Sequence, residues 1–124
     1  MSAQTPIARV EGLGASHSGT GHFWRQRVSA LALVPLSIWF VCMALSLIGA
    51  HRHEAIAFLS APVNAILMAL FIIAALHHMV LGVQVVIEDY VHGEGPKIAL
   101  LVSNQFFAWL VGAACLFALV KIAL

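Results

Sequence analysis

Residues 55–87, AIAFLSAPVNAILMALFIIAALHHMVLGVQVVI, form an uninterrupted stretch of 33 residues without Asp, Glu, Lys or Arg. Two further uncharged stretches flank it, Val28–Gly49 with 22 residues and Ile98–Val120 with 23. About 20 apolar residues are enough for a helix to cross a bilayer, where only helices and closed barrels satisfy the backbone polar groups. The sequence therefore predicts an all-α integral membrane protein with three transmembrane helices.

The composition agrees with this fold class, since 62% of the residues are hydrophobic, 9% are charged and the mean hydropathy is +1.00. A water-soluble domain of this length does not tolerate such values. We place the spans at about residues 28–49, 63–88 and 98–120, within one membrane domain of residues 22–124. Residues 1–21 are polar and rich in Gly, Ser and Thr, without the apolar core of a signal peptide. They are predicted to be a flexible cytoplasmic tail.

The positions of Lys and Arg indicate the orientation. If the N-terminus is cytoplasmic, Arg52 and Lys121 lie outside, and the other four basic residues lie inside: Arg9, Arg25, Arg27 and Lys97. This distribution agrees with the positive-inside rule. It also places Arg25 and Arg27 at the same membrane edge as Asp89 and Tyr90, which follow the second span. The formal net charge of +1 and the lack of a basic run indicate no nucleic-acid partner.

Two histidines, His77 and His78, lie within the second uncharged stretch. An ionisable ring is costly in hydrocarbon, so such a residue is a candidate for a metal or haem ligand or a proton relay. At 100° per residue, His77 points about 100° away from one stripe of the helix. That stripe consists of His78, Gly82, Val85 and Asp89. The missing side chain of Gly82 leaves room beside the imidazole for a flat macrocycle or a closely packed helix.

Each of these residues also has a structural interpretation. His78 could hydrogen-bond a neighbouring helix, Gly82 could be a packing notch, and Tyr90 could belong to the aromatic belt at the membrane surface. Taken one at a time, the structural interpretations are favoured. Taken together at this spacing, the residues favour a functional site.

Other motifs point to structure rather than chemistry. Cys42 and Cys115 fall inside spans and are expected to be buried free thiols rather than a disulfide. His51 and His53 belong to a polar outer connection and are expected to be solvated rather than to bind metal. We expect a helix start at Pro62, and the stretch His92–Pro96 is predicted to be the turn between the second and third spans.

The spacing of His78, Gly82, Asp89 and Tyr90 resembles a known family, the small hydrophobic membrane anchor of succinate dehydrogenase (respiratory complex II). That family carries a histidine, a glycine four residues later and Asp-Tyr eleven and twelve residues later, at the end of the second of three spans. The stretch His22–Leu31, HFWRQRVSAL, also looks like the start of the family's first span. The resemblance in length and topology covers about residues 22–124.

The resemblance implies specific roles for four residues. His78 matches an axial ligand of haem b, whose iron takes its second ligand from the other membrane anchor, a cytochrome b-type subunit. Tyr90 matches a tyrosine that hydrogen-bonds ubiquinone, and Asp89 is its neighbour in that site. Arg27 matches an arginine at the edge of the haem propionates and the quinone site. His77 lacks the spacing to Gly82 and Asp89, so it is expected to hydrogen-bond within the bundle or face the partner subunit.

The resemblance further implies a subunit of the bacterial cytoplasmic (inner) membrane that tethers a flavoprotein and an iron–sulfur subunit. Electrons from succinate then reach ubiquinone through FAD and iron–sulfur clusters held only by those partners. This chain has no glycine-rich nucleotide loop and too few cysteines for a cluster, so no catalytic residue is expected in the chain alone.

Two alternatives belong to other classes. An anchor of a quinol:fumarate reductase or another di-haem cytochrome b would call for further intramembrane histidines, and the first and third spans contain none. A small proton-coupled transporter would typically carry a carboxylate within a span, and all five acidic residues lie outside the three uncharged stretches.

Overall fold

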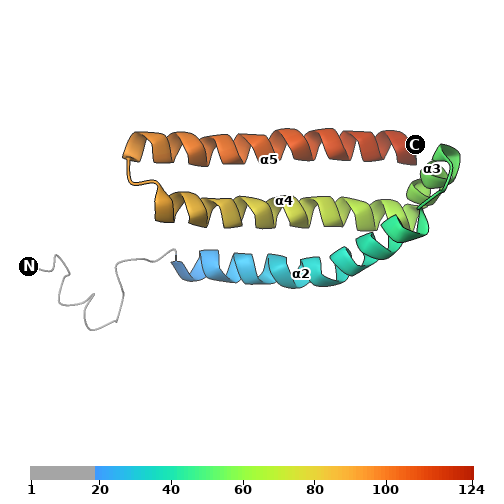
Figure 1. Cartoon of the computed structure of the whole chain (residues 1–124), viewed down its shortest axis with the longest axis horizontal. Helices are drawn as coiled ribbons and strands as arrows, with labels where there is room; N and C mark the ends of the chain where they lie inside the picture. The colour runs from blue at the N-terminus through green and yellow to red at the C-terminus, as the bar shows by residue number, and fades with distance from the viewer. Residues whose placement is uncertain (1–18) are drawn as a thin grey trace, which may run out of the picture.

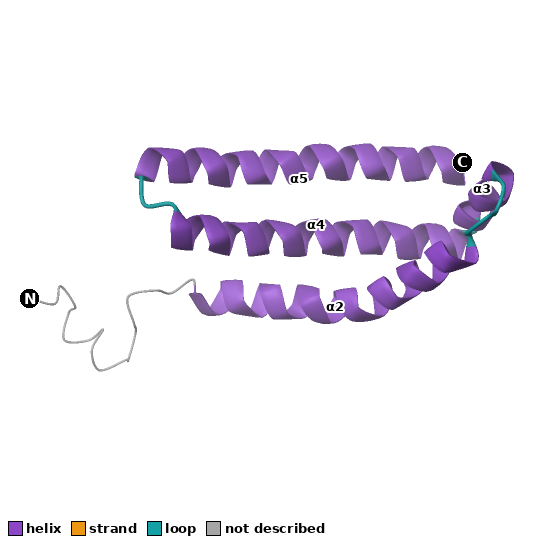
Figure 2. Cartoon of the chain, in the orientation of Figure 1, coloured by secondary structure: helices purple, strands orange, loops and turns teal. Residues whose placement is uncertain are grey.

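The computed structural model describes residues 19–124 as helices joined by short connections (Figure 2). The helices in this part of the chain are α2 (Gly19–Ser46), α3 (Arg52–Ser60), α4 (Pro62–Tyr90) and α5 (Glu94–Ala123). Three of them contain segments long and apolar enough to cross a membrane, Thr20–Ser46, Pro62–Tyr90 and Glu94–Ala123. The predicted fold class is confirmed.

The three long helices lie in a row with α4 in the middle (Figure 1). Helix α4 packs against both α2 and α5, whereas α2 and α5 make no contact with each other within residues 19–124. A row of three helices leaves two broad faces uncovered, unlike a closed bundle. Since α4 has neighbours along both of its edges, its side chains are the best placed to combine groups from different helices.

Helix α2 begins three residues before the predicted domain boundary at residue 22 and ends before the predicted limit of its span at residue 49. Its second half bends away from the direction of the first (Figure 1), and Pro35 lies inside the helix. Proline has no backbone N–H, and its ring clashes with the carbonyl one turn earlier, so a kink is the expected result. The helix is followed by Gly49, whose φ of +79° suits a residue without a side chain.

The predicted outer connection contains a short helix, α3, which packs across the end of α4 and α5 (Figure 1). The carboxylate of Glu54 accepts a hydrogen bond of 2.7 Å from the backbone N–H of His51 and so caps the start of α3. The side-chain amide of Asn64 in α4 donates to the carbonyl of Phe58 at 2.9 Å. These bonds tie the connection to the bundle.

The second and third spans are joined by a tighter turn than the sequence predicts. Helix α4 starts at Pro62, as expected, but α5 already starts at Glu94. Only residues 91–93 are non-helical, so the prediction that His92–Pro96 as a whole forms the turn is wrong. Pro96 fits in the first turn of α5 because the amide groups there have no helical partner. A Cβ at Gly93 would lie 3.3 Å from the Pro96 ring, so a larger residue there would require that ring to shift by a few tenths of an ångström.

Packing between the helices rests on a few close contacts. The rings of Phe40 and Phe71 stack between α2 and α4, with centroids 4.6 Å apart. Asn104 of α5 donates a hydrogen bond of 3.1 Å to the carbonyl of Val80 in α4. A side chain added at Gly112 would come within 3.1 Å of Leu76, which shows how closely α4 and α5 approach there. Small residues and side-chain hydrogen bonds are the usual means of holding helices together in lipid.

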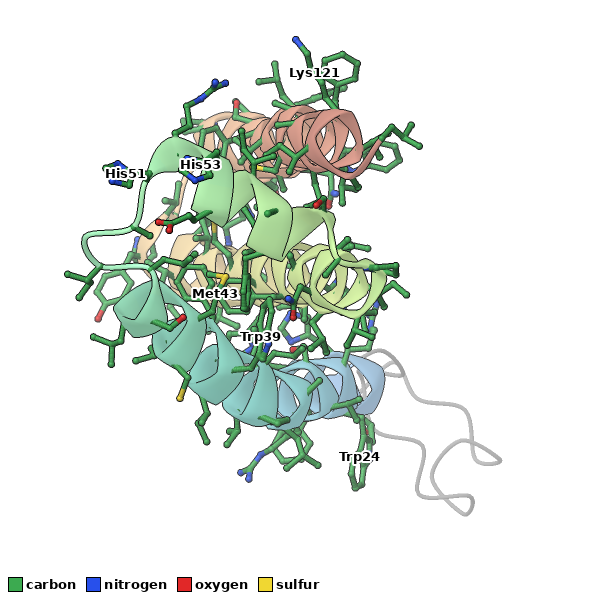
Figure 3. The ribbon with its side chains drawn as sticks, turned by 90° about the vertical axis from the view of Figure 1, so that its right-hand side faces the viewer. Trp24, Trp39, Met43, His51, His53 and Lys121 are labelled. Atoms are coloured by element: carbon green, nitrogen blue, oxygen red, sulfur yellow. The ribbon has the colours of Figure 1, made fainter. Side chains whose placement is uncertain are left out.

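Most apolar side chains point outward, as expected for a membrane-spanning row. In Figure 3, Trp39 and Met43 lie on the side of α2 that faces its neighbours, while Trp24 and Lys121 point away from the bundle. Cys42 and Cys115 are free, as expected, but both are exposed. The prediction that they are buried is therefore wrong for the isolated chain, because the row gives each outer helix only one covered side.

Candidate functional site

His78 lies on α4 next to the first half of α2, and its side chain is half-buried. Its ring nitrogen Nδ1 is 3.0 Å from the hydroxyl oxygen of Ser29 on α2. The same hydroxyl donates a hydrogen bond of 2.9 Å to the carbonyl of Gln26. The other ring nitrogen, Nε2, has no hydrogen-bond partner in the part of the chain that the structure describes.

A cavity of about 320 Å³ lies against His78 and α2. Besides His78, it is lined by Phe23, Gln26, Arg27 and Ala30. The guanidinium carbon of Arg27 lies 4.9 Å from the centre of the Phe23 ring, in a cation–π contact. Arg27 itself is exposed and keeps donors free for another partner. The structure thus brings the predicted residues His78 and Arg27 to the same cavity.

Gly82 lies one turn along α4 from His78, on the same stripe of the helix. A side chain added at Gly82 would meet no other atom within 4 Å. The glycine is therefore not needed for packing within residues 19–124. The structure therefore has the expected room beside the His78 imidazole, and this space is not filled by other atoms of the described residues.

His77 lies elsewhere on α4 and is exposed. It lines two cavities of about 470 Å³ each, one between α4 and α5 and one between α4 and α2. Arg25, whose Nε donates to the carbonyl of Gly21 at 3.3 Å, lines both of them. The pair His77 and Arg25 therefore belongs to different cavities from the pair His78 and Arg27.

Asp89 and Tyr90 lie at the end of α4 and are exposed, with 78% of the Tyr90 surface accessible. Neither lines any of these three cavities. The contact of Ser29 with His78 sets the register of the antiparallel helices α2 and α4. At 1.5 Å per residue, Tyr90 then lies about 18 Å along the axis from His78, but Arg27 only about 3 Å. Arg27 and Tyr90 are therefore at the same end of the bundle, about 15 Å apart along the axis.

Two polar residues near the cavity were not singled out from the sequence. Ser29 is buried, with 7% of its surface accessible, and its contact with His78 depends on a register between helices that no sequence motif reveals. His22, at the start of α2, has a buried Nε2 without a hydrogen-bond partner among residues 19–124. The only feature of the sequence that could have indicated His22 was its position just before the aromatic and basic stretch of α2.

The other histidine pair does not form a metal centre with a third residue. His51 and His53 stack their rings with centroids 5.8 Å apart beside α3 (Figure 3). Within residues 19–124, no three His, Cys, Asp or Glu side chains are grouped so that they could hold a metal ion.

Comparisons with known proteins place the chain among membrane anchors. A family model described as succinate dehydrogenase/fumarate reductase transmembrane subunit matches residues 1–120. The succinate dehydrogenase hydrophobic membrane anchor subunit of Paracoccus denitrificans is 36% identical over 120 residues, which cover 97% of this chain and 92% of the relative. The subunit of the same name from Rickettsia bellii is 31% identical over 102 residues, 82% of each chain. The comparison with solved structures found no match.

Proposed function

The chain belongs to the succinate dehydrogenase/fumarate reductase transmembrane subunit family, and from this we propose that it is the hydrophobic membrane anchor of a succinate dehydrogenase. In this role it works with a second membrane anchor to hold the flavoprotein and iron–sulfur subunits at the cytoplasmic face of a bacterial inner membrane. Electrons from succinate pass through those subunits to ubiquinone. The printed names of the Paracoccus and Rickettsia relatives favour succinate dehydrogenase over fumarate reductase.

The single observation that carries the cofactor proposal is the shared cavity of His78 and Arg27. Three features of that region fit a haem b. His78 has a ring nitrogen without a protein partner, Arg27 carries an exposed guanidinium, and the helix surface at Gly82 is open. An imidazole is a common axial ligand of haem iron, and a guanidinium pairs well with carboxylates such as haem propionates.

In the proposed site, a haem b supplies one-electron transfer near the quinone. His78 would hold the haem iron through Nε2, and Arg27 would offer charge-assisted hydrogen bonds to the haem carboxylates. The residues that line the cavity belong to α2 and α4, so a second ligand of the haem iron would come from the second anchor. His77 lines other cavities and has no part in this site.

We assign the quinone contact to Tyr90, with Asp89 beside it. Both are exposed at the end of α4, where the helix leaves the membrane, so a headgroup can reach them while its tail stays in lipid. A phenol donates a hydrogen bond to a carbonyl oxygen, and that bond strengthens as the quinone gains electrons. Neither residue lines any of the three cavities described above, and in this proposal the walls of the quinone site would be supplied by a partner subunit.

Purification of the tagged chain from gently solubilised membranes tests the proposal. We expect a flavin-containing subunit, an iron–sulfur subunit and a second small hydrophobic subunit to co-purify, and the sample to show the optical spectrum of a b-type cytochrome. A chain that purifies alone, without flavin or haem, would favour a small transporter instead. The activity of the purified complex with succinate and a ubiquinone analogue then separates succinate dehydrogenase from other cytochromes b.

A further inference from the structure

We propose that Ser29 is a positioning residue for His78: its hydroxyl accepts a hydrogen bond from Nδ1–H and holds the imidazole with Nε2 free for the haem iron. The inference rests on the proposed haem ligation and adds a residue from another helix to it. It is built on the 3.0 Å contact between Ser29 Oγ and His78 Nδ1 across α2 and α4.

The two contacts of the hydroxyl decide the direction of the bond. A serine hydroxyl has one hydrogen to donate and lone pairs that accept. The carbonyl of Gln26, 2.9 Å away, can only accept, so this bond uses the hydrogen of Ser29. The contact with His78 is then a hydrogen bond only if Nδ1 carries the proton. This network assigns the tautomer with its lone pair on Nε2, the form that binds a metal through Nε2.

The burial of Ser29 supports a specific contact with His78 rather than an incidental one. Ser29 is the only buried polar residue in the described part of the chain, with 7% of its surface accessible. Ser46 and Ser60 make the same local bond to a carbonyl three residues earlier, at 2.7 Å and 3.0 Å. Of these three serines, only Ser29 also forms a hydrogen-bond contact with a side chain of another helix. The local bond alone therefore does not explain why Ser29 is placed opposite His78.

The function of such a bond is known from metal sites in general. A histidine ligand almost always donates its other N–H to a partner, which fixes the ring and raises its basicity, and loss of that partner typically costs 10- to 100-fold in metal affinity or activity. A less basic ligand stabilises ferric iron less. Removal of the Ser29 hydroxyl should therefore loosen the haem and raise its midpoint potential.

Three variants of the complete complex separate positioning from packing. Ser29→Ala removes the hydroxyl, Ser29→Thr keeps a hydroxyl on the same carbon, and Ser46→Ala is the matched control without a histidine contact. Each complex is purified with its co-purifying subunits, and flavin content reports assembly. The measurements are the rate of haem transfer to an apo-globin acceptor, the low-spin electron paramagnetic resonance signal and the haem midpoint potential.

We expect Ser29→Ala to speed haem loss roughly 10-fold and to shift both the signal and the potential, the latter upward. Ser29→Thr should restore wild-type values, and Ser46→Ala should keep them. Wild-type haem properties in Ser29→Ala would overturn the inference, and so would equal changes in Ser29→Ala and Ser29→Thr, which indicate packing. If Ser29→Ala behaves as wild type while His78→Ala loses haem, only this inference fails. If His78→Ala keeps a wild-type haem signal, the proposed ligand itself fails.

Discussion

His77 and His78 are adjacent in the sequence but line different cavities. His78 shares a cavity with Arg27, whereas His77 shares two others with Arg25. On α2, Arg25 and Arg27 are separated by about 200° of helix rotation, so the two histidine–arginine pairs face different sides of the row. Of the two histidines, only His78 has a hydrogen-bond contact with the buried Ser29 and lies one turn from Gly82, where an added side chain would meet open space.

The first prediction concerns the haem ligand. His78→Ala removes the proposed axial ligand, and His77 cannot replace it because it points about a quarter turn away. We expect the low-spin haem signal of the purified complex to be lost or strongly changed in His78→Ala. His77→Ala is the matched control and should keep the wild-type spectrum. Wild-type spectra in both variants would contradict the assignment.

The second prediction concerns the open surface at Gly82. A Cβ added at Gly82 meets no atom of the described chain within 4 Å, so we expect the Gly82→Val chain to fold and insert normally. If a haem occupies that space, the valine side chain overpacks the site at a cost of about 1–3 kcal/mol. This cost corresponds to roughly 5- to 150-fold weaker haem binding. The haem-to-flavin ratio of the complex measures this effect. Gly21→Val, which also meets open space, is the control and should keep the ratio.

The third prediction concerns the quinone. Tyr90→Phe keeps the ring but deletes the phenolic donor, and a bond lost with its partner left unpaired costs about 1–3 kcal/mol. Succinate-driven reduction of a ubiquinone analogue should fall roughly tenfold or more. Reduction of a water-soluble acceptor by the same complex should stay normal, because the proposed site of succinate oxidation lies in another subunit. Unchanged quinone reduction would leave Tyr90 as a residue of the aromatic belt.

The fourth prediction concerns packing of α4 against α5. Asn104→Leu removes the hydrogen bond to the Val80 carbonyl, and such bonds in membranes contribute about 0.6 kcal/mol on average and up to about 1.7. We expect the unfolding temperature of the complex to fall by a few degrees without a change in the haem spectrum. Gln105→Leu removes a neighbouring exposed amide that makes no hydrogen bond among residues 19–124 and should leave the temperature unchanged.

The fifth prediction concerns orientation. His53 in α3 and His92 between α4 and α5 are exposed at opposite ends of the row. In a chain without Cys42 and Cys115, His53→Cys should react with an impermeant thiol reagent from outside the cell. His92→Cys should react only after the membrane is opened. Reaction of both from the same side would contradict three spans with a cytoplasmic N-terminus.

The sequence was sufficient for the spans but not for the shape of the helices. Three uncharged stretches predicted three membrane helices, because charge is costly in lipid whatever the packing. The turn at His92–Pro96 was overestimated, since Gly95 and Pro96 are compatible with the first turn of a helix as well as with a loop. The kink at Pro35 and the helix α3 were not predicted; α3 is short, and its start at Arg52 reads as a polar connection.

The same distinction applies to the candidate site. The angular relation of His77, His78 and Gly82 follows from helix geometry alone, and the structure agrees with it. The pairing of Ser29 with His78 depends on how far α2 slides along α4, which neither helix encodes by itself. The same register separates Arg27 from Tyr90 by about 15 Å along the axis, although both flank their spans in the sequence.

The open row of three helices also has a consequence for copies of this subunit that are not assembled into a complex. In a closed bundle the polar groups are covered by the chain itself. In this chain, the imidazole of His78 and the guanidinium of Arg27 line an open cavity and stay uncovered until other subunits bind. Each surplus copy therefore exposes polar groups to lipid, at a cost that only assembly removes. We expect unassembled copies to be short-lived targets of membrane proteases, so that the amount of this subunit follows the synthesis of the proposed second anchor.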